Sequence, residues 1–237
     1  MTTKEKLLAL LEDSKGTFFS GEEIARTLQV SRAAVWKAVN ALREDGYTID
    51  AATNKGYRLS PDSDILSPQG IRRFLKPECR DLDLTVLPTA PSTNALVREK
   101  ANQGRPEGCV IVACEQTAGR GRYGRQFFSP VDSGVYLSLL LRPTAYSPQQ
   151  ATCLTAAAAA AMCQAIEAVT GQQPGIKWVN DIFLHGKKVC GILTEAGTDL
   201  ESGQLEWLVV GIGLNLTATA EDFPPELTAK AGSLYPG

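Results

Sequence analysis

The chain has 237 residues, of which 43% are apolar and 21% charged, and its formal net charge is −2. This composition supplies apolar material for a small domain plus one of ordinary size, and it excludes a generally basic nucleic-acid-binding protein. The first nine residues are charged and lack an apolar signal core, and no stretch approaches the roughly 20 apolar residues that span a bilayer.

The cysteines occur singly, without the C-x-x-C pairs that bind zinc or perform redox chemistry. Because their surroundings are apolar, we expect them to be reduced core thiols. Together with the missing signal core, they predict a soluble, cytoplasmic protein that has no membrane partner. The six positions are Cys79, Cys109, Cys114, Cys153, Cys163 and Cys190.

The first 60 residues predict three helices and a hairpin. Leucines among charges predict a helix over 4–12 that ends near Lys15-Gly16. Ser20 and Glu23 have the spacing of a capping box and begin a short second helix. Ser31 caps a third helix, which Gly46 ends. Period-2 alternation on both sides of the turn 53–56 predicts a β-hairpin.

Three helices and a hairpin in this order predict a winged helix-turn-helix, which reads DNA with its third helix and its wing. Residues 1–60 hold nine Lys or Arg against eight Asp or Glu. Binding by one copy should therefore be weak, and two copies on a palindrome are expected. The predicted DNA contacts are Arg32, Lys37, Asn40, Arg43, Lys55 and Arg58.

The segment 61–64, one proline followed by small polar residues, predicts a linker, which gives an N-terminal domain over 1–62 and a second domain over 63–237. Strand-like runs and helical segments alternate in the second domain, which indicates a mostly β sheet with helices packed on it. The Ala-rich segment 151–169 predicts a close-packed core helix. The runs lie at 84–87, 109–113, 134–141, 176–184, 188–193 and 205–212.

Glycines and arginines alternate over 119–125, directly after the strand that ends at Ala113. Glycines let backbone amides approach an anion closely, and arginine forks neutralise phosphate or carboxylate oxygens. The alternative is a flexible basic surface loop. Although the glycines fit G-x-G-x-x-G, no acidic residue follows at the distance that a dinucleotide fold requires, so that fold is weakly supported.

Three other segments carry polar groups or glycines where a ligand could lie. Lys177 and Asp181 stand in an otherwise apolar run, which costs several kcal/mol unless they are paired with each other or face a ligand cavity. Ser92-Thr93-Asn94 begins a helix and either binds a small polar ligand or caps the helix. Gly211 and Gly213 indicate close approach of a ligand or backbone, or a β-bulge.

The order of these parts resembles the biotin protein ligase family, specifically its bifunctional ligase/repressor members, over essentially all 237 residues. After the winged helix-turn-helix come S-T-N, Q-x-A-G-R-G-R-x-G-R, K-W-x-N-D-I, G-K-K-x-x-G-I-L-x-E and G-I-G-x-N. The resemblance implies an α+β chain, in which the winged helix-turn-helix precedes a mixed-sheet catalytic domain of the biotin/lipoate ligase type, similar to class II synthetases.

The resemblance also implies site residues. Lys177, Arg120 and Arg122 would be catalytic, with Lys177 the central cation. The implied biotin-binding residues are Ser92, Thr93, Asn94, Gln116, Gly119, Arg120, Gly121, Arg122, Lys177 and Gly191. The implied nucleotide-binding residues are Arg122, Tyr123, Arg125, Phe127, Asn180, Asp181 and Asn215. No metal site of the protein alone is implied, and Mg²⁺ would accompany ATP.

Three departures from the family pattern stand out. Phe127 replaces a frequent Trp and removes an indole donor, and Val179 replaces a Pro. The family carries a small C-terminal β-barrel, whereas this chain stops at Gly237, so we interpret it as a fragment or truncated form.

The implied reaction joins the biotin carboxylate to the α-phosphate of ATP, and a lysine of biotin carboxyl carrier protein then takes the biotin. The implied partners are that carrier protein, operator DNA and a second copy of the chain, in a homodimer that biotinyl-adenylate promotes by ordering the loop 117–125. One rival is a repressor that senses a ligand and catalyses nothing; the other is a lipoate or octanoyl ligase.

Overall fold

The computed structural model describes residues 1–199, 201 and 203–235. Its contacts divide the chain into two compact units, Met1–Arg80 and Asp81–Gly237.

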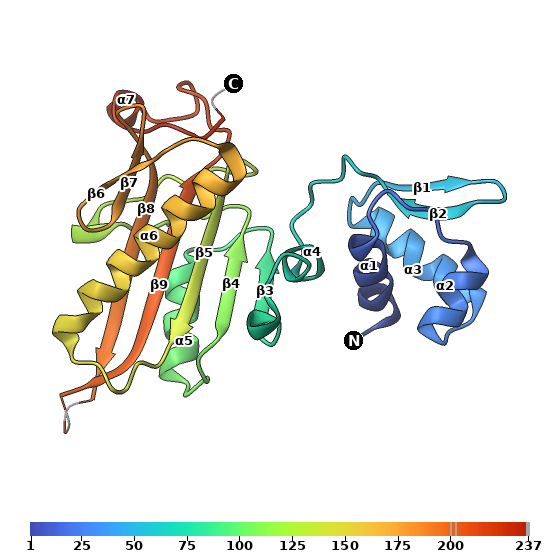
Figure 1. Ribbon diagram of the computed structural model, residues 1–237, viewed down its shortest axis with the longest axis horizontal. Coiled ribbons are helices and arrows are strands. Elements are labelled where there is room, and N and C mark those ends of the chain that lie inside the picture. Colours follow the sequence, from blue (N-terminus) through green and yellow to red (C-terminus); the bar gives the residue numbers. More distant parts are fainter. Residues whose placement is uncertain (200, 202, 236–237) are drawn as a thin grey trace. The chain divides into compact units, whose positions relative to one another are not determined.

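The N-terminal unit contains α1 (Thr3–Asp13), α2 (Gly21–Leu28), α3 (Arg32–Glu44) and the hairpin of β1 (Ile49–Ala52) and β2 (Gly56–Leu59) (Figure 1). Ser20 and Ser31 cap α2 and α3, because their Oγ atoms accept from the backbone N–H of Glu23 at 3.1 Å and of Ala34 at 3.2 Å. The winged helix-turn-helix is confirmed.

The N-terminal unit continues past the predicted linker. Helix α4 (Pro68–Arg72) packs on α1, and the short 3-10 turn Pro77–Cys79 follows it. The Cα of Gly70 lies so close to Glu12 that a Cβ there would stand 3.2 Å from Oε1 of that carboxyl. The sequence assigned residues 63–80 to the second domain. In the structure they belong to the first unit, because α4 follows the linker and packs on α1.

The second unit is built on a mixed seven-stranded sheet in the order β3-β4-β5-β9-β8-β7-β6. Only β3 and β4 pair in parallel, and the other neighbours are antiparallel. The mixed sheet of the prediction is confirmed. Its strands are β3 (Asp83–Leu87), β4 (Cys109–Ala113), β5 (Gly134–Leu141), β6 (Gly175–Lys177), β7 (Asp181–Leu184), β8 (Lys187–Thr198) and β9 (Leu205–Asn215).

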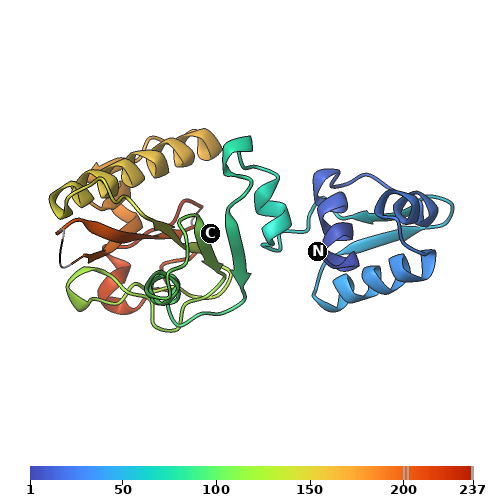
Figure 2. The ribbon, with the colours of Figure 1, turned by 90° about the horizontal axis from the view of Figure 1, so that it is seen from below.

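Helices cover both faces of this sheet (Figure 2). Helix α5 (Thr93–Asn102) packs Val97 against Leu140 of β5 and Val209 of β9. Helix α6 (Ala151–Thr170) packs Ala159 and Ile166 against the opposite face. Side chains along the strands therefore point alternately into two hydrophobic cores, one on each face of the sheet. The face that α5 covers also carries polar side chains. Short helical turns lie at Arg122–Gly124, Pro148–Gln150 and α7 (Pro225–Thr228).

Helix α6 is less buried than the sequence predicted. Only Thr155, Ala159 and Ile166 are fully buried, because one side of the helix rests on the sheet and the other is exposed. Among the described residues, Pro148–Thr170 is also long and apolar enough to span a membrane by length and composition, which the sequence analysis did not anticipate. Helix α6 packs on strands β6 to β9, which explains why the side of the helix that faces the sheet is apolar.

Two further expectations were wrong in part. The cysteines are free thiols, but Cys79 and Cys153 are exposed rather than in the core. The run 176–184 is not one strand, because residues 178–180 form a turn that separates β6 from β7. Strand β6 lies at the edge of the sheet with all of its residues exposed.

Candidate active site

A pocket of about 430 Å³ lies on the α5 face of the sheet, where the first turn of α5, strands β8 and β9, and the Gly-Arg loop 117–125 meet. It brings together segments that are separated by up to 121 positions, from Ser92 to Gly213. The residues of the predicted site that line it are Ser92, Thr93, Asn94, Gln116, Arg120, Gly121, Arg122, Phe127, Asn180 and Gly191.

Glycines of β9 form the floor of the pocket. A Cβ on Gly211 would stand 1.8 Å from Oδ1 of Asn94, and one on Gly213 would stand 2.5 Å from the ring of Phe127. The pairing of β9 with β5 and β8 runs without interruption through these two positions, so they are not a β-bulge. The glycines therefore permit the close approach that the sequence predicted.

The first turn of α5 supplies buried polar groups. Ser92 caps the helix, with its Oγ 3.5 Å from the backbone N of Ala95, and it also lines the pocket. The backbone N of Thr93 donates to Oε1 of Gln116 at 2.9 Å, and the Oγ1 of Thr93 lies 3.2 Å from the same oxygen. Nε2 of Gln116 donates to Ser129 Oγ at 3.0 Å. In the described part of the chain its second amide hydrogen has no protein acceptor, so Gln116 can donate to a ligand.

The Gly-Arg loop forms one wall of the pocket through Arg120, Gly121 and Arg122. Gly119 is buried behind it, and a Cβ there would stand 2.4 Å from the carbonyl oxygen of Phe127. Nη1 of Arg122 donates to Oδ1 of Asn180 at 2.9 Å, which ties the loop to the turn after β6. The loop is thus part of a built pocket and not only a basic surface loop.

The lysine that lines the pocket is Lys188 of β8. Its Nζ lies 2.7 Å from Oδ1 of Asp181 and 5.9 Å from the centre of the Phe127 ring. The sequence analysis quoted the G-K-K motif but assigned no role to this residue. A second lysine at the start of a strand that otherwise becomes buried was the available signal.

Lys177 lies elsewhere. It is exposed on the edge strand β6, with its Nζ 5.4 Å from the centre of the Phe183 ring, and it does not line the pocket. The expectation of a buried lysine was wrong, because it depended on one continuous strand over 176–184. For Asp181 the ion-pair alternative holds, with Lys188 as the partner instead of Lys177.

Four residues implied to bind the nucleotide, Asp181 among them, also lie outside the pocket lining. Tyr123 is 85% exposed, and Arg125 is exposed beside it. Asn215 is buried and donates from Nδ2 to the carbonyl oxygen of Gly232 at 2.9 Å, so it holds the segment after α7. Among residues 1–199, 201 and 203–235, no group of three or more His, Cys, Asp or Glu could hold a metal ion.

The predicted DNA contacts divide into two groups. Arg32 and Lys37 are exposed on α3, Asn40 is half-buried on the same helix, and Lys55 is exposed in the turn of the wing. Arg43 instead donates twice to the carbonyl oxygen of Ile49, at 2.7 and 3.1 Å, and Arg58 pairs with Asp50 at 2.8 Å. These two guanidinium groups hold the wing in place.

Each of the two units matches a known protein family. A model described as the biotin/lipoate A/B protein ligase family matches residues 86–215, and a helix-turn-helix domain model matches residues 3–58. Bifunctional ligase/repressor BirA of Bacillus subtilis (strain 168) is 42% identical over 233 residues, which are 98% of this chain and 71% of that protein. The chain belongs to the bifunctional ligase/repressor family.

The chain is also similar to more distant ligases. Bifunctional ligase/repressor BirA of Escherichia coli (strain K12) is 33% identical over 91% of this chain and 64% of its own length. A solved biotin protein ligase from Aquifex aeolicus, in complex with biotin and ATP, matches with a TM-score of 0.53 and 30% identity over 65% of this chain and 60% of that chain. The biotin protein ligase of Leishmania major, in complex with biotinyl-5-AMP, matches with a TM-score of 0.52 and 25% identity over 64% and 63% of the two chains.

Proposed function

We propose that this member of the bifunctional ligase/repressor family is an ATP-dependent biotin protein ligase that also acts as a biotin-responsive repressor. The observation that carries the ligase proposal is the pocket itself, in which a polar helix turn, two arginines and Lys188 surround a floor of glycines. The relatives that bind biotin and ATP support the same assignment.

The polar end of the pocket is suited to the cyclic urea of biotin. Gln116 offers an N–H for the urea carbonyl, and the hydroxyl oxygens of Ser92 and Thr93 can accept from the urea N–H groups. Each contact uses a neutral hydrogen-bonding group, which matches a neutral heterocycle. Because these groups are largely buried, a ligand of the wrong shape that leaves them without hydrogen-bond partners binds with a large loss of free energy.

The cationic wall is suited to the reacting end. When the biotin carboxylate attacks the α-phosphate of ATP, negative charge builds on the phosphate oxygens and on the leaving pyrophosphate. Lys188, Arg120 and Arg122 supply cations at that wall and stabilise this charge. Mg²⁺ bound to the ATP phosphates would neutralise part of the remaining charge. In the second step a lysine amine of biotin carboxyl carrier protein attacks the activated carbonyl, and AMP leaves.

The ligase assignment is tested by incubating the chain with ATP, Mg²⁺ and, in separate reactions, biotin, lipoate or octanoate. Pyrophosphate and the acyl-adenylate are then measured. We expect both products with biotin only. Binding of biotin without pyrophosphate release would favour a repressor that only senses the ligand, and equal turnover of lipoate or octanoate would favour the second rival.

The repressor proposal places α3 and the wing on operator DNA. Arg32 and Lys37 are exposed and carry the charge that phosphates attract, so replacing both with Ala should abolish the gel shift of an operator fragment. An unchanged shift would exclude this surface. The free thiols of the chain suit the reducing cytoplasm, where we place the protein.

The corepressor proposal concerns the loop 117–125. Three glycines and three arginines make the loop costly to order until an anion offsets its charge, and biotinyl-adenylate supplies that anion. Ordering of the loop then favours a homodimer, by about tenfold to a hundredfold for a coupling of 1–3 kcal/mol. Sedimentation with and without biotin plus ATP tests this, and equal dimerisation in both conditions would refute it.

A further inference from the structure

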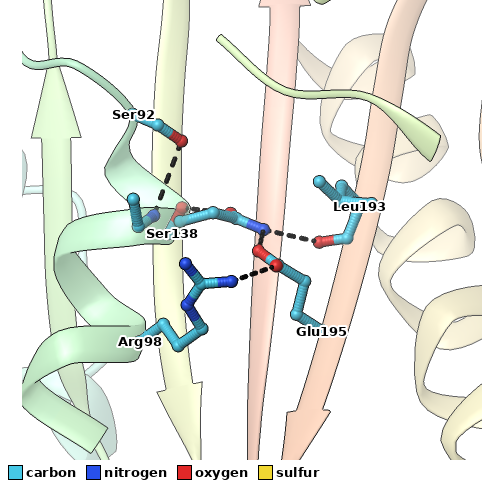
Figure 3. Close-up of polar contacts among 7 residues, drawn as sticks. Ser92, Arg98, Ser138, Leu193 and Glu195 are labelled. Carbon is cyan, nitrogen blue, oxygen red and sulfur yellow. Dashed lines mark hydrogen bonds and ion pairs between the residues drawn. The ribbon is translucent and has the colours of Figure 1, made fainter. Parts of the chain in front are cut away.

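An ion pair outside the pocket reaches a pocket residue. Nη1 of Arg98 on α5 lies 3.0 Å from Oε1 of Glu195 on β8, and the two side chains are 38% and 24% exposed. The other carboxylate oxygen, Oε2, accepts from Nδ2 of Asn94 at 2.9 Å. Because Asn94 and Arg98 are one helical turn apart, the carboxylate bridges two positions on the same face of α5. Figure 3 shows Glu195 between Arg98 and Leu193 on the face of the sheet that α5 covers.

The contacts of Asn94 allow only one orientation of its amide. Asn94 is 4% exposed, and its Nδ2 also lies 3.2 Å from the carbonyl oxygen of Leu193. A carbonyl and a carboxylate can only accept, so the amide nitrogen must face them. Oδ1 is thereby turned toward Oγ of Ser138, which donates to it at 2.6 Å, and toward Gly211 on the pocket floor.

This orientation continues through Ser138 to the ligand-binding turn. Oγ of Ser138, which is fully buried on β5, also lies 2.8 Å from Oγ1 of Thr93. Because the single hydroxyl hydrogen of Ser138 goes to Asn94, the 2.8 Å contact takes the hydroxyl hydrogen of Thr93, which leaves the oxygen of Thr93 able to accept from a ligand. A chain of hydrogen bonds thus begins at the carboxylate of Glu195 and ends at the hydroxyl of Thr93, whose backbone N–H separately donates to Oε1 of Gln116 at 2.9 Å.

We propose that Glu195 and Arg98 are positioning residues for the biotin end of the pocket. Glu195 fixes the amide of Asn94 and, through Ser138, the direction of the Thr93 hydroxyl; Arg98 neutralises and holds the carboxylate. The proposal rests on the proposed function, because it assigns the pocket end that Thr93 serves to biotin. It concerns binding of the acid substrate and not the chemical step, since neither residue lines the pocket.

The chain contains a matched control. Arg105, which follows α5, and Asp83 of β3 form another ion pair, with Nη2 of Arg105 2.7 Å from Oδ2 of Asp83. The two side chains are 53% and 47% exposed. That carboxylate holds no pocket residue, so Asp83→Asn removes a comparable surface charge pair without touching the hydrogen-bond chain. An effect common to both pairs would therefore come from stability or net charge.

The experiment measures biotin affinity by calorimetry, and the KM values for biotin and ATP together with kcat, for the whole chain. Glu195→Leu and Arg98→Leu should each raise the Kd and KM for biotin, by about tenfold for Glu195→Leu, with KM for ATP and kcat unchanged. Glu195→Gln, which keeps an acceptor for Asn94, should recover most of the affinity. Arg98→Leu should add little in the Glu195→Leu background, because both act through one carboxylate.

Several outcomes would overturn the proposal. These are a biotin Kd within about twofold of wild type in both Leu variants, equal losses for biotin and ATP, or the same loss in Asp83→Asn. Should Glu195→Leu fail to fold, Arg98→Leu and Glu195→Gln carry the test. Failure of the wild-type chain to bind biotin would instead refute the proposed function, and this inference with it.

Discussion

The same substitution should have opposite effects at Lys188, which lines the pocket, and at Lys177, which does not. Lys188→Met removes the ammonium group at the cationic wall and keeps an unbranched side chain to pack beside Phe127. Lys177→Met removes an ammonium group that lies outside the pocket, on the exposed edge strand β6. We expect the first variant to lose adenylate formation and the second to retain it.

The size of the effect follows from where Lys188 lies. Its side chain is 32% exposed and its Nζ pairs with Asp181 at 2.7 Å, so the site is partly screened by water. At an effective dielectric constant near 20, a unit charge about 4 Å from a reacting phosphate contributes roughly 4 kcal/mol, and Asp181 offsets part of it. A fall in rate of about 10²- to 10³-fold is therefore expected. The loss of stability should stay near 0–1 kcal/mol, as for a partly exposed ion pair.

The assay is biotin-dependent exchange of pyrophosphate into ATP, with urea unfolding as the measure of stability. Lys188→Met should lose exchange while its unfolding midpoint stays close to that of the wild type. The reasoning fails if Lys188→Met exchanges at the wild-type rate, or if Lys177→Met is the variant that loses it. The second result would restore Lys177 as the central cation that the sequence implied.

Three further predictions concern other residues. Gly211→Ala should lower biotin affinity at least tenfold, because a Cβ there displaces Asn94, whereas Gly175→Ala, where a Cβ meets nothing within 4 Å, should bind normally; equal affinities would contradict the pocket floor. Burial raises the pKa of Cys190 to about 12, so at pH 8 its thiol should resist a disulfide reagent that labels exposed Cys79, and rapid labelling of Cys190 would be inconsistent with its burial. Burial also raises the pKa of the Glu12 carboxyl, so the folded state binds its proton more tightly than the unfolded state, and stability is lost as the pH rises through the window just above the ordinary value of 4.5. Glu12→Gln should therefore flatten that decline in urea unfolding, and an unchanged profile would refute it.

Much of the fold follows from local patterns. Ser20 and Ser31 stand at helix starts because a hydroxyl before a polar turn satisfies free backbone N–H groups, and each hydroxyl accepts a backbone N–H of its helix's first turn. In the seven-stranded sheet, the strands other than β6 follow apolar runs because they are buried on at least one face, whereas β6 is exposed throughout. The run 176–184 misleads for a physical reason: its apolar residues suggest burial, but the turn at 178–180 contains neither Gly nor Pro.

The site was predictable where motif residues contact the ligand pocket themselves. Thr93 belongs to the S-T-N motif, and Gln116 and the Gly-Arg loop belong to the next motif along the chain. The structure brings the two motifs together at the pocket. Glu195 and Arg98 were given no role, although Glu195 ends the quoted motif G-K-K-x-x-G-I-L-x-E, because the two residues are 97 positions apart and no pattern in the sequence links them. Lys188 was given no role because the resemblance directed attention to Lys177, which lies before the turn at 178–180 on the exposed edge strand β6 and outside the pocket lining.

The central claim is that this pocket joins the carboxylate of biotin to the α-phosphate of ATP. It is tested most directly with biotin whose carboxylate oxygens are isotopically labelled, in a full reaction with ATP, Mg²⁺ and biotin carboxyl carrier protein. If a biotinyl-adenylate forms and is consumed, one labelled oxygen must leave with AMP, and mass spectrometry should find it there. Label in inorganic phosphate or pyrophosphate, or biotinylated carrier with unlabelled AMP, would contradict the account.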